Sequence, residues 1–365
     1  MRIILFGTFI DYQIQLSNAL VKENNSVLSI ILANKLSEDY LGNVDKRVNL
    51  HLLGKGKSLY DPTSIIILKE LVKTITEFNP DIIHLQLGQG IVFLTLLPLL
   101  TIYPLVSTFH DAKLHIGENS KWFNFTRYWI RKCSNRIIVH GDKLKECMIN
   151  EFKLSNEKVH AIPIGEHEVA PFKKYERDDL KEDHNLILFF GRIYKYKGLE
   201  YLIKAEPLIS KKIPDVKIII AGIGEDFKKY EKMIRDIDNF IIYNRYISYK
   251  EGAELFQRCN IVVLPYIEAS QSGVIMTAYG FKKPVVVTNV GSIPEVVDNG
   301  LTGIIVPPKN SVILAESIIK LLRNDDLRRK MGENGYKKLK KDLSWNNIAN
   351  KTIDVYYEAI NSKKK

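Results

Sequence analysis

Cysteine is scarce in this chain of 365 residues, which has three, at Cys133, Cys147 and Cys259. Their number is odd, and they lie far apart in the sequence, outside any spacing typical of a metal site. Disulfides persist mainly in oxidising compartments. We therefore expect a reducing compartment, the cytoplasm, with no disulfide framework and no zinc centre.

Several motifs of familiar enzyme classes are missing as well. The chain has no nucleophile elbow, no His-Glu-x-x-His and no Walker lysine loop, which leaves hydrolase and NTPase functions without support. A Gly-x-Gly that begins at Gly222 lacks the third glycine of the dinucleotide-binding fingerprint. The first strand, which ends at Gly7, lacks that pattern too. These absences argue against a nicotinamide-dependent dehydrogenase.

Long uncharged stretches are rare, and residues 91–109 are apolar enough to suggest a membrane span. Pro98 and Pro104 interrupt them, and they fall where a helix and then a buried strand are expected. The N-terminus meets Asp11 too early to be a secretion signal and is typical of a buried first strand. We expect a helix and a strand at 91–109 rather than a span.

Basic residues are in excess: 53 Lys and Arg against 42 Asp and Glu give a formal net charge of +11. Nucleic acid, an anionic membrane surface and phosphorylated substrates all suit such a charge. Residues 121–136 leave two interpretations open: a helix that shows a basic face to water, or an interfacial helix that rests on anionic lipid. The stretch contains Trp122, Phe125, Trp129 and Ile130 among Lys121, Arg127, Arg131, Lys132 and Arg136.

Short apolar runs alternate with helical patterns in both halves of the chain. One series extends from residues 2–7 to 158–165 and the other from 185–191 to 303–308, with a polar stretch between them. Continuous apolar runs are typical of parallel strands covered on both faces. The sequence predicts an α/β protein with two Rossmann-like parallel-sheet domains, 1–165 and 185–343, joined by a linker at 166–184 and facing across a cleft. Ligands of such sheets bind beyond the carboxyl ends of the strands.

Polar side chains follow several of these predicted strands. Arg192 and Lys197 come after the strand that ends at 190, and this pair suits a diphosphate; ordinary surface salt bridges are the alternative. His110 follows another strand and is either a polar anchor or proton relay or a hydrogen-bonded structural histidine. His84 and His140 are open to the same structural explanation.

A small polar run, residues 270–273, separates a buried strand from a helix. The first N–H groups of a helix have no partner within it, and a glycine such as Gly273 lets a phosphate approach them. An ordinary turn capped by the Ser272 side chain is the alternative.

Taken in order, GR..K.KG, AG.GE, SGV and KPVVVTNVGSIPEVVDNGLTGIIVPP resemble the retaining GT-B glycosyltransferases, specifically glycosyltransferase family 4. STFHD at 107–111 and RIIVHGDKLKECMINEF at 136–152 agree with the family's N-terminal domain. Residues 344–360 are similar to its closing helices, so 344–365 should cross back onto the first domain. The resemblance spans nearly the whole chain and is most specific at 261–308.

The resemblance implies a nucleotide-diphosphate sugar in the C-terminal domain and an acceptor in the N-terminal domain. The expected catalytic residues are His110, Arg192 and Lys197. Thr277 and Ala269 stand where the family commonly carries two glutamates, with Glu268 one place away from the first. Arg192 and Lys197 also belong to the expected donor-binding set, which includes Gly7, Gly222, Tyr246, Glu268, Ser272, Gly273, Val274 and Thr277.

The implied reaction is transfer of a hexose to a hydroxyl acceptor with retention, in bacterial cell-surface polysaccharide or glycolipid assembly. The acceptor is a lipid-linked or soluble sugar, and we expect no nucleic-acid partner. No Asp-x-Asp occurs in a suitable loop, so we expect neither a metal nor another cofactor. The enzyme would be cytoplasmic, with possible peripheral contact to an anionic membrane. The alternative is a non-enzymatic basic protein that binds a polyanion or a membrane surface.

Overall fold

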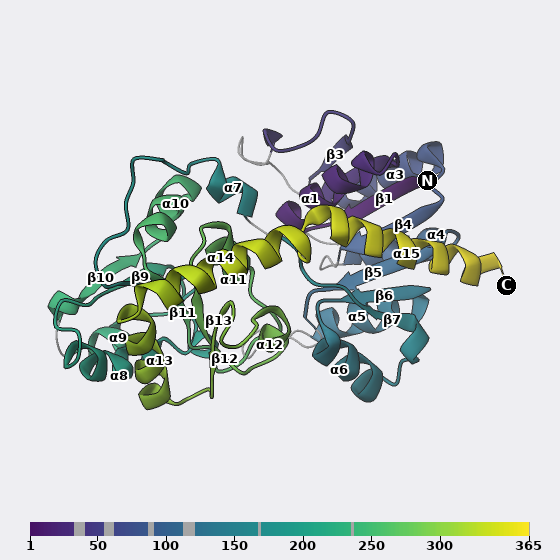
Figure 1. Cartoon of the computed structure of the whole chain (residues 1–365). Helices are drawn as coiled ribbons and strands as arrows, with labels where there is room; N and C mark the ends of the chain where they lie inside the picture. Colours follow the sequence, from purple (N-terminus) through teal and green to yellow (C-terminus); the bar gives the residue numbers. More distant parts are fainter. Residues whose placement is uncertain are drawn as a thin grey trace. The chain divides into compact units, whose positions relative to one another are not determined.

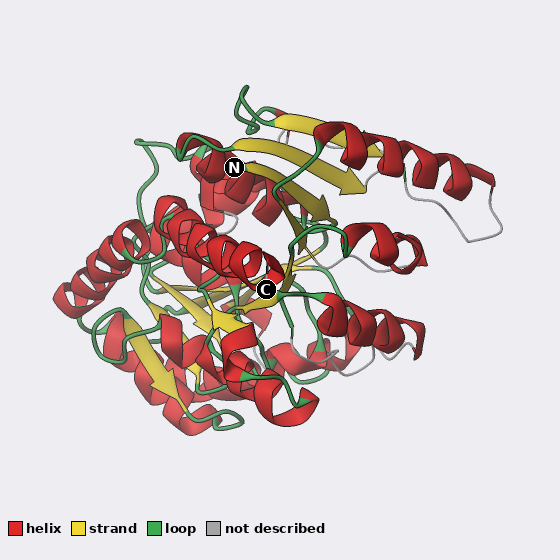
Figure 2. Ribbon diagram, turned by 90° about the vertical axis from the view of Figure 1, so that its right-hand side faces the viewer, coloured by secondary structure: helices red, strands yellow, loops and turns green. Residues whose placement is uncertain are grey.

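A computed structural model describes residues 1–32, 41–54, 62–86, 91–111, 121–166, 169–234 and 237–364. The chain divides into two compact units, Met1–Pro163 with Trp345–Lys365, and Ile164–Ser344. Each unit contains one parallel sheet with helices around it (Figures 1 and 2). The predicted α/β class with two parallel-sheet domains is confirmed.

The first unit is built on a seven-stranded sheet in the order β3-β2-β1-β4-β5-β6-β7, in which all described pairs are parallel. Strands β1, β4 and β5 are buried almost throughout, which explains their continuous apolar sequences. The strand order reverses between β1 and β4, and such a switch point is where open α/β sheets bind ligands. The strands are β1 (Arg2–Gly7), β2 (Ser26–Leu32), β3 (Asn49–Leu53), β4 (Ile82–Gln86), β5 (Leu105–Phe109), β6 (Arg136–Val139) and β7 (Val159–Ala161).

The helices of the first unit connect these strands or close the chain. They are α1 (Ile10–Lys22), α3 (Pro62–Phe78), α4 (Ile91–Leu100), α5 (Lys121–Cys133), α6 (Asp142–Phe152) and α15 (Trp345–Lys364), with a 3-10 turn η1 (Asn156–Lys158). Residues 91–109 form α4 and then β5, as the sequence predicts. No helix in the described part of the chain is long and apolar enough to cross a membrane.

The last helix, α15, belongs to the first unit although it follows the second unit in sequence. It packs on α1, β5 and β6 (Figure 1). Tyr356 is fully buried, and its hydroxyl lies 2.7 Å from Nδ1 of His84 on β4. The C-terminal residues therefore return to the first sheet and contribute to its interior.

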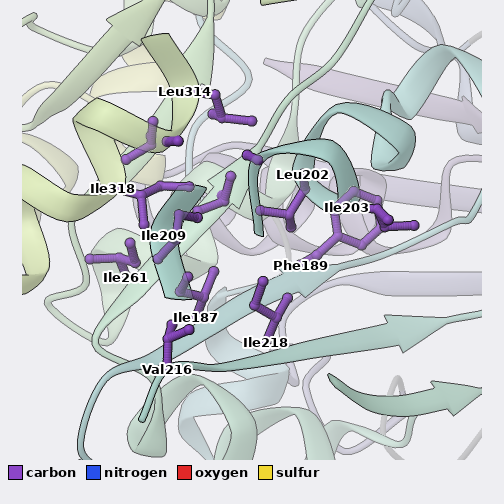
Figure 3. Packing of buried hydrophobic residues seen from close by; sticks show 14 of the residues in the cluster. Ile187, Phe189, Leu202, Ile203, Ile209, Val216, Ile218, Ile261, Leu314 and Ile318 are labelled. Carbon is purple, nitrogen blue, oxygen red and sulfur yellow. The ribbon is translucent and has the colours of Figure 1, made fainter. Parts of the chain in front are cut away.

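The second unit is built on a six-stranded parallel sheet in the order β10-β9-β8-β11-β12-β13. Apolar side chains from α8 and α13 cover one face of it: Leu202, Ile203, Leu314 and Ile318 lie in one buried cluster with strand residues such as Ile187 (Figure 3). The strands are β8 (Leu186–Phe190), β9 (Lys217–Gly222), β10 (Phe240–Asn244), β11 (Ile261–Leu264), β12 (Val285–Thr288) and β13 (Gly303–Val306).

The helices of this unit follow its strands in alternation. They are α7 (Val169–Lys173), α8 (Leu199–Ser210), α9 (Lys228–Glu231), α10 (Tyr249–Arg258), α11 (Gly273–Gly280), α12 (Ile293–Val296), α13 (Ser311–Leu322) and α14 (Asp325–Lys341). The 3-10 turns are η2 (Lys195–Lys197) and η3 (Ile237–Asn239).

The segment predicted as a linker is not a free connection. Its described residues, 166 and 169–184, lie within the second unit, where Val169 and Phe172 are buried. The Phe172 ring meets the Phe190 and Phe256 rings edge to face. A Cβ added at Gly252 would lie 2.3 Å from the Phe172 ring, so the glycine makes room for it. The polar composition of the segment concealed these two apolar anchors.

Candidate functional site

Two neighbouring strands of the second unit end in backbone that is in direct contact. Gly222, at the end of β9, has a φ of +148°, and a Cβ there would lie 1.8 Å from the Gly191 carbonyl oxygen. The Gly191 N–H donates to the Ala221 carbonyl at 2.9 Å. Packing alone therefore requires glycine at 222, and contact of Gly222 with the donor stays a prediction. The same holds for Gly7 of the first unit, where a Cβ would lie 2.0 Å from the Gln86 carbonyl oxygen.

The loop that carries Arg192 and Lys197 is fastened to the loop that follows β11. The Ile267 N–H donates to the Tyr196 carbonyl at 2.8 Å. Gly198 has a φ of +65°, and a Cβ there would lie 2.0 Å from the Pro265 carbonyl oxygen. These contacts hold the end of the loop that carries Lys197 beside Tyr266, whose hydroxyl contacts Ser272 at the start of α11.

Lys197 and Arg192 both lie close to Tyr266. Lys197 Nζ is 3.8 Å from the centre of the Tyr266 ring. Burial raises the pKa of Tyr266 to about 12, and the nearby Arg192 charge opposes that rise. Within the described part of the chain, the exposed Arg192 guanidinium forms no ion pair with a carboxylate. The surface salt bridge proposed as the alternative explanation for Arg192 is therefore wrong.

The start of α11 lacks a side-chain cap. Ser272 occupies the N-cap position with φ −146° and ψ 115°, but its side chain accepts no hydrogen bond from the helix. Its Oγ lies 3.1 Å from the Tyr266 hydroxyl instead. The N-cap side chains of α10, α13 and α14, which are Ser248, Asn310 and Asn324, do accept from their helices, whereas α1, α6, α8 and α12 lack such a cap as α11 does. The ordinary turn with a serine cap is therefore excluded for residues 270–273.

The uncapped helix start lies beside the end of β8. Cγ2 of Val274, in the first turn of α11, lies 3.7 Å from the place of a Cβ on Gly191. The Arg192 loop, Tyr266 and the first N–H groups of α11 thus converge at the carboxyl edge of β8 and β11. Two cations and outward-directed backbone donors are a combination that can bind an anion as large as a diphosphate.

Other residues of the predicted donor set lie around this edge in different environments. Glu268 is exposed, and its N–H faces the Tyr196 carbonyl at 3.4 Å. Thr277 is only 1% exposed, and its hydroxyl faces the Gly273 carbonyl of its own helix at 3.5 Å. Tyr246, 71% exposed, follows β10, two places from β8 in the sheet. Their contacts with a donor stay predictions.

His110 of the first unit lies in a buried hydrogen-bonded chain. Its Nε2 lies 3.2 Å from Oε1 of Gln86, and its Nδ1 lies 3.0 Å from Nε2 of His140. His140 Nδ1 donates in turn to the Ile162 carbonyl at 3.0 Å. Both nitrogens of His110 are thus engaged within the protein, as in the structural explanation. A direct catalytic role for His110 stays a prediction.

The same chain continues from Gln86 to the last helix. Nε2 of Gln86 lies 3.1 Å from Nε2 of His84, and His84 also contacts the hydroxyls of Thr108 and Tyr356, each at 2.7 Å. Burial, with a smaller contribution from the charge on His140, lowers the pKa of His84 to about 3. His84 is therefore neutral at ordinary pH.

Sequence reasoning missed several members of these two clusters. Tyr266 had a weak signal, since it is an aromatic residue between a buried strand and the polar run at 270–273. Gln86 ends β4 much as His110 follows β5, and polar residues at two adjacent strand ends were a usable sign. Tyr356 had none, because its partner lies 272 positions away.

Helix α5 turns two of its basic residues inward and leaves Lys132 exposed, so both interpretations of residues 121–136 were wrong about Arg127 and Arg131. Arg127 and Arg131 are 5% and 8% exposed, and both pack on the Phe109 ring. The exposed side carries Phe125, Tyr128 and Trp129, which are 42–49% exposed and in mutual ring contact. We call these three residues the outer aromatic face of α5. The side chains of residues 121–123 lie outside the described part.

In the described part of the chain, no three His, Cys, Asp or Glu residues gather in a way that could hold a metal ion. The expectation of a metal-independent protein without a cofactor stays a prediction.

Residues 12–165 match the family model Glycosyltransferase Family 4, and residues 172–338 match the model Glycosyl transferases group 1. An uncharacterized glycosyltransferase of Methanocaldococcus jannaschii is 28% identical over 334 residues, 88% of each chain. The capsular polysaccharide biosynthesis glycosyltransferase CapM of Staphylococcus aureus is 26% identical over 301 residues, 76% of this chain and 77% of CapM.

Solved structures agree in fold. Anabaena HepE in complex with UDP and glucose superposes with a TM-score of 0.75 at 15% identity, covering 98% of this chain and 99% of HepE. Together with the two sheets, this likeness identifies the GT-B architecture.

Proposed function

We propose that this chain, which carries domains of glycosyltransferase family 4 and of glycosyl transferases group 1, transfers a hexose from a nucleotide-diphosphate sugar to a hydroxyl acceptor with retention. The observation that carries this proposal is the uncapped start of α11 beside Arg192 and Lys197. The UDP bound by HepE, a protein of the same fold, supports a nucleoside diphosphate as the anion.

The proposed chemistry rests on charge that develops in the transition state. As the glycosidic bond to phosphate breaks, negative charge gathers on the departing diphosphate and positive charge on the sugar ring. The Arg192 guanidinium, the Lys197 ammonium and the first N–H groups of α11 would bind the diphosphate. Each charge-assisted hydrogen bond contributes about 1.5–3 kcal/mol. This arrangement needs no metal ion.

The position of Lys197 suits this role, because its ammonium lies on the π face of Tyr266, whose hydroxyl contacts Ser272 at the start of α11. Retention agrees with the state of His110, whose two nitrogens already have partners and which is therefore not poised as the base of an inverting reaction. Glu268, exposed in the loop before α11, is the carboxylate that we assign to the transferred sugar.

The acceptor that we propose is a lipid-linked sugar in cell-surface polysaccharide or glycolipid assembly. The likeness to CapM, named for capsular polysaccharide biosynthesis, supports this choice. The outer aromatic face of α5 supports it independently, since exposed Trp and Tyr side chains favour the membrane interface. The protein would then act in the cytoplasm, peripherally attached to the inner face of the membrane.

The test is to incubate the purified protein with UDP-, GDP- and ADP-sugars and to measure released nucleoside diphosphate. We expect slow hydrolysis of one donor, lost in Arg192→Ala. The matched control is Arg177→Ala, which removes an exposed arginine of the same unit that is paired with Asp179. With an acceptor, NMR of the product's anomeric proton would report whether configuration is retained.

The proposal would be contradicted if no donor released nucleoside diphosphate and no nucleoside diphosphate stabilised the protein against heat. Strongly salt-dependent binding of polyanions in the same protein would then favour the basic binding protein. The inward-facing Arg127 and Arg131 weaken that alternative, because they remove two charges from the surface.

A further inference from the structure

The buried, hydrogen-bonded side chains of His110 and His140 hold one proton more than two neutral imidazoles would. The Ile162 carbonyl only accepts, so Nδ1 of His140 must carry a proton. At the other end, Nε2 of His110 faces the amide oxygen of Gln86, so it must carry a proton as well. The 3.0 Å contact between Nδ1 of His110 and Nε2 of His140 needs a third proton, which lies between the two rings. Two neutral imidazoles hold two protons, and this pair holds three.

The orientation of the Gln86 amide follows from its other neighbour. Nε2 of the neutral His84 faces both Nε2 of Gln86, at 3.1 Å, and the Thr108 hydroxyl, at 2.7 Å, and we assign it as the acceptor of both. Nδ1 of His84 then keeps the proton and donates to the Tyr356 hydroxyl. With its nitrogen directed at His84, the Gln86 amide has only its oxygen to offer His110. The contacts of His84 with Gln86 and with Tyr356, on α15, therefore determine how many protons the His110–His140 pair holds.

We propose that His110 and His140 form one proton-sharing imidazole pair with a single positive charge, and that Gln86 and His140 are positioning residues for His110. Burial disfavours a charged group, and here the hydrogen bonds at both ends and between the rings oppose that cost. The Phe9 ring adds a further contribution, because it stacks on His110 with a centroid distance of 3.8 Å at 16°.

Other titratable groups lie around the pair. The Tyr12 ring meets His110 edge-on at 5.1 Å and His140 at 5.3 Å, and burial raises the pKa of Tyr12, so it stays neutral. His84 lies across Gln86. Asp11 and Asp111 are the sequence neighbours of Tyr12 and His110, and the Asp111 charge acts on Arg127.

This inference rests on the proposed function for its consequence. A histidine that already holds a proton on each nitrogen cannot remove one from the acceptor hydroxyl. In the catalytic role predicted for it, His110 would therefore act by its positive charge. That role differs from a proton relay, and it makes Gln86 and His140 necessary for activity although neither needs to touch the substrate.

The decisive measurement is NMR of the full chain with ¹⁵N-labelled histidine at neutral pH. The sequence has eight histidines, and His110→Asn and His140→Asn assign the two signals of interest by loss. We expect protonated nitrogens at His110 Nε2 and His140 Nδ1, and a scalar coupling between the rings across the shared proton. A bare Nε2 on His110 would overturn the proposal, because both rings would then be neutral. The protonation states are read from the wild-type spectrum, and the variants serve only to assign its signals.

Kinetics test the positioning roles. We expect His110→Asn and His140→Asn each to lower kcat by at least tenfold, and the double variant to be no worse than the stronger single one. If the free-energy losses in kcat of the two single variants simply added in the double variant, the proposed coupling between His110 and His140 would be wrong. The matched control is His160→Asn on β7 of the same sheet, which is half-buried and near Glu358, and which should leave kcat unchanged.

The two proposals fail separately. A spectrum with the shared proton in a protein that uses no sugar donor would leave the pair in place and remove the proposed function. Sugar transfer by a protein whose His110–His140 pair is neutral would support the proposed function and overturn the inference about the pair.

Discussion

The ammonium group of Lys197 lies 3.8 Å from the centre of the Tyr266 ring. Tyr266 is itself held at both ends, because its hydroxyl meets Ser272 and its carbonyl accepts from Thr288 Oγ1 at 2.6 Å. A rigid aromatic face thus positions a cation beside the start of α11, where an anionic ligand would be bound.

This relationship predicts that the Tyr266 ring matters more than its hydroxyl. Tyr266→Leu should raise the KM for the sugar donor by roughly 2- to 30-fold, since a cation–π contact is worth about 0.5–2 kcal/mol. Tyr266→Phe keeps the ring and should change KM by less. Donor-saturation kinetics with Tm measured in parallel decide the matter, and equal KM values in the two variants would contradict the role of the ring.

Inorganic pyrophosphate alone should stabilise the protein if the site recognises the diphosphate. At a hundredfold excess over Kd, binding to the folded state adds about 2.7 kcal/mol. We expect a rise in Tm of a few degrees, absent in Arg192→Ala and reduced in Lys197→Ala, by differential scanning fluorimetry. Arg177→Ala, with an exposed and paired arginine, should respond like wild type. A rise that persists in Arg192→Ala would place pyrophosphate elsewhere.

The fold was largely predictable from the sequence, since parallel strands covered on both faces have continuous apolar runs that stand out between helices. The convergence of the Arg192 loop with residues 270–273 was accessible for the same reason, because both follow strands of one sheet. The packing of residues 166–184 was not. Val169 and Phe172 are two apolar residues in a charged stretch, and the glycines that receive them, Gly280 and Gly252, lie 111 and 80 positions away.

The orientation of α5 shows a second limit. A helical pattern gives two faces, but it does not say which one an arginine prefers when a phenylalanine ring is available in the interior. Arg127 and Arg131 pack their guanidinium groups on the ring of Phe109, from the adjacent β5. Hydrophobicity scales assign such residues to water, so periodicity alone selected the wrong face.

The outer aromatic face of α5 should bind anionic vesicles. Trp129→Ala with Tyr128→Ala should weaken sedimentation with phosphatidylglycerol vesicles at least severalfold, because Trp and Tyr favour the bilayer interface. Donor hydrolysis in solution should not change. Lys132→Ala removes an exposed cation beside these rings and should lower only the salt-sensitive part of vesicle binding. The matched control is Ile66→Ala on α3, an apolar residue that is 63% exposed. Undiminished vesicle binding in the double variant would show that the outer aromatic face of α5 does not bind the membrane.

His84 should make the protein lose stability as pH falls below about 6.5. Its folded-state pKa is lowered to about 3, so between 6.5 and 3 the unfolded chain binds a proton that the folded chain does not. Stability from this group is complete above the unfolded pKa and is lost as pH falls, by up to about 1.4 kcal/mol per pH unit. In His84→Gln, where no such proton exists, Tm should fall less between pH 7.5 and 5.5 than in wild type. His184→Gln, which removes an imidazole with 83% side-chain exposure, should track wild type. Parallel melting curves for wild type and His84→Gln would mean that the buried imidazole takes up its proton without unfolding.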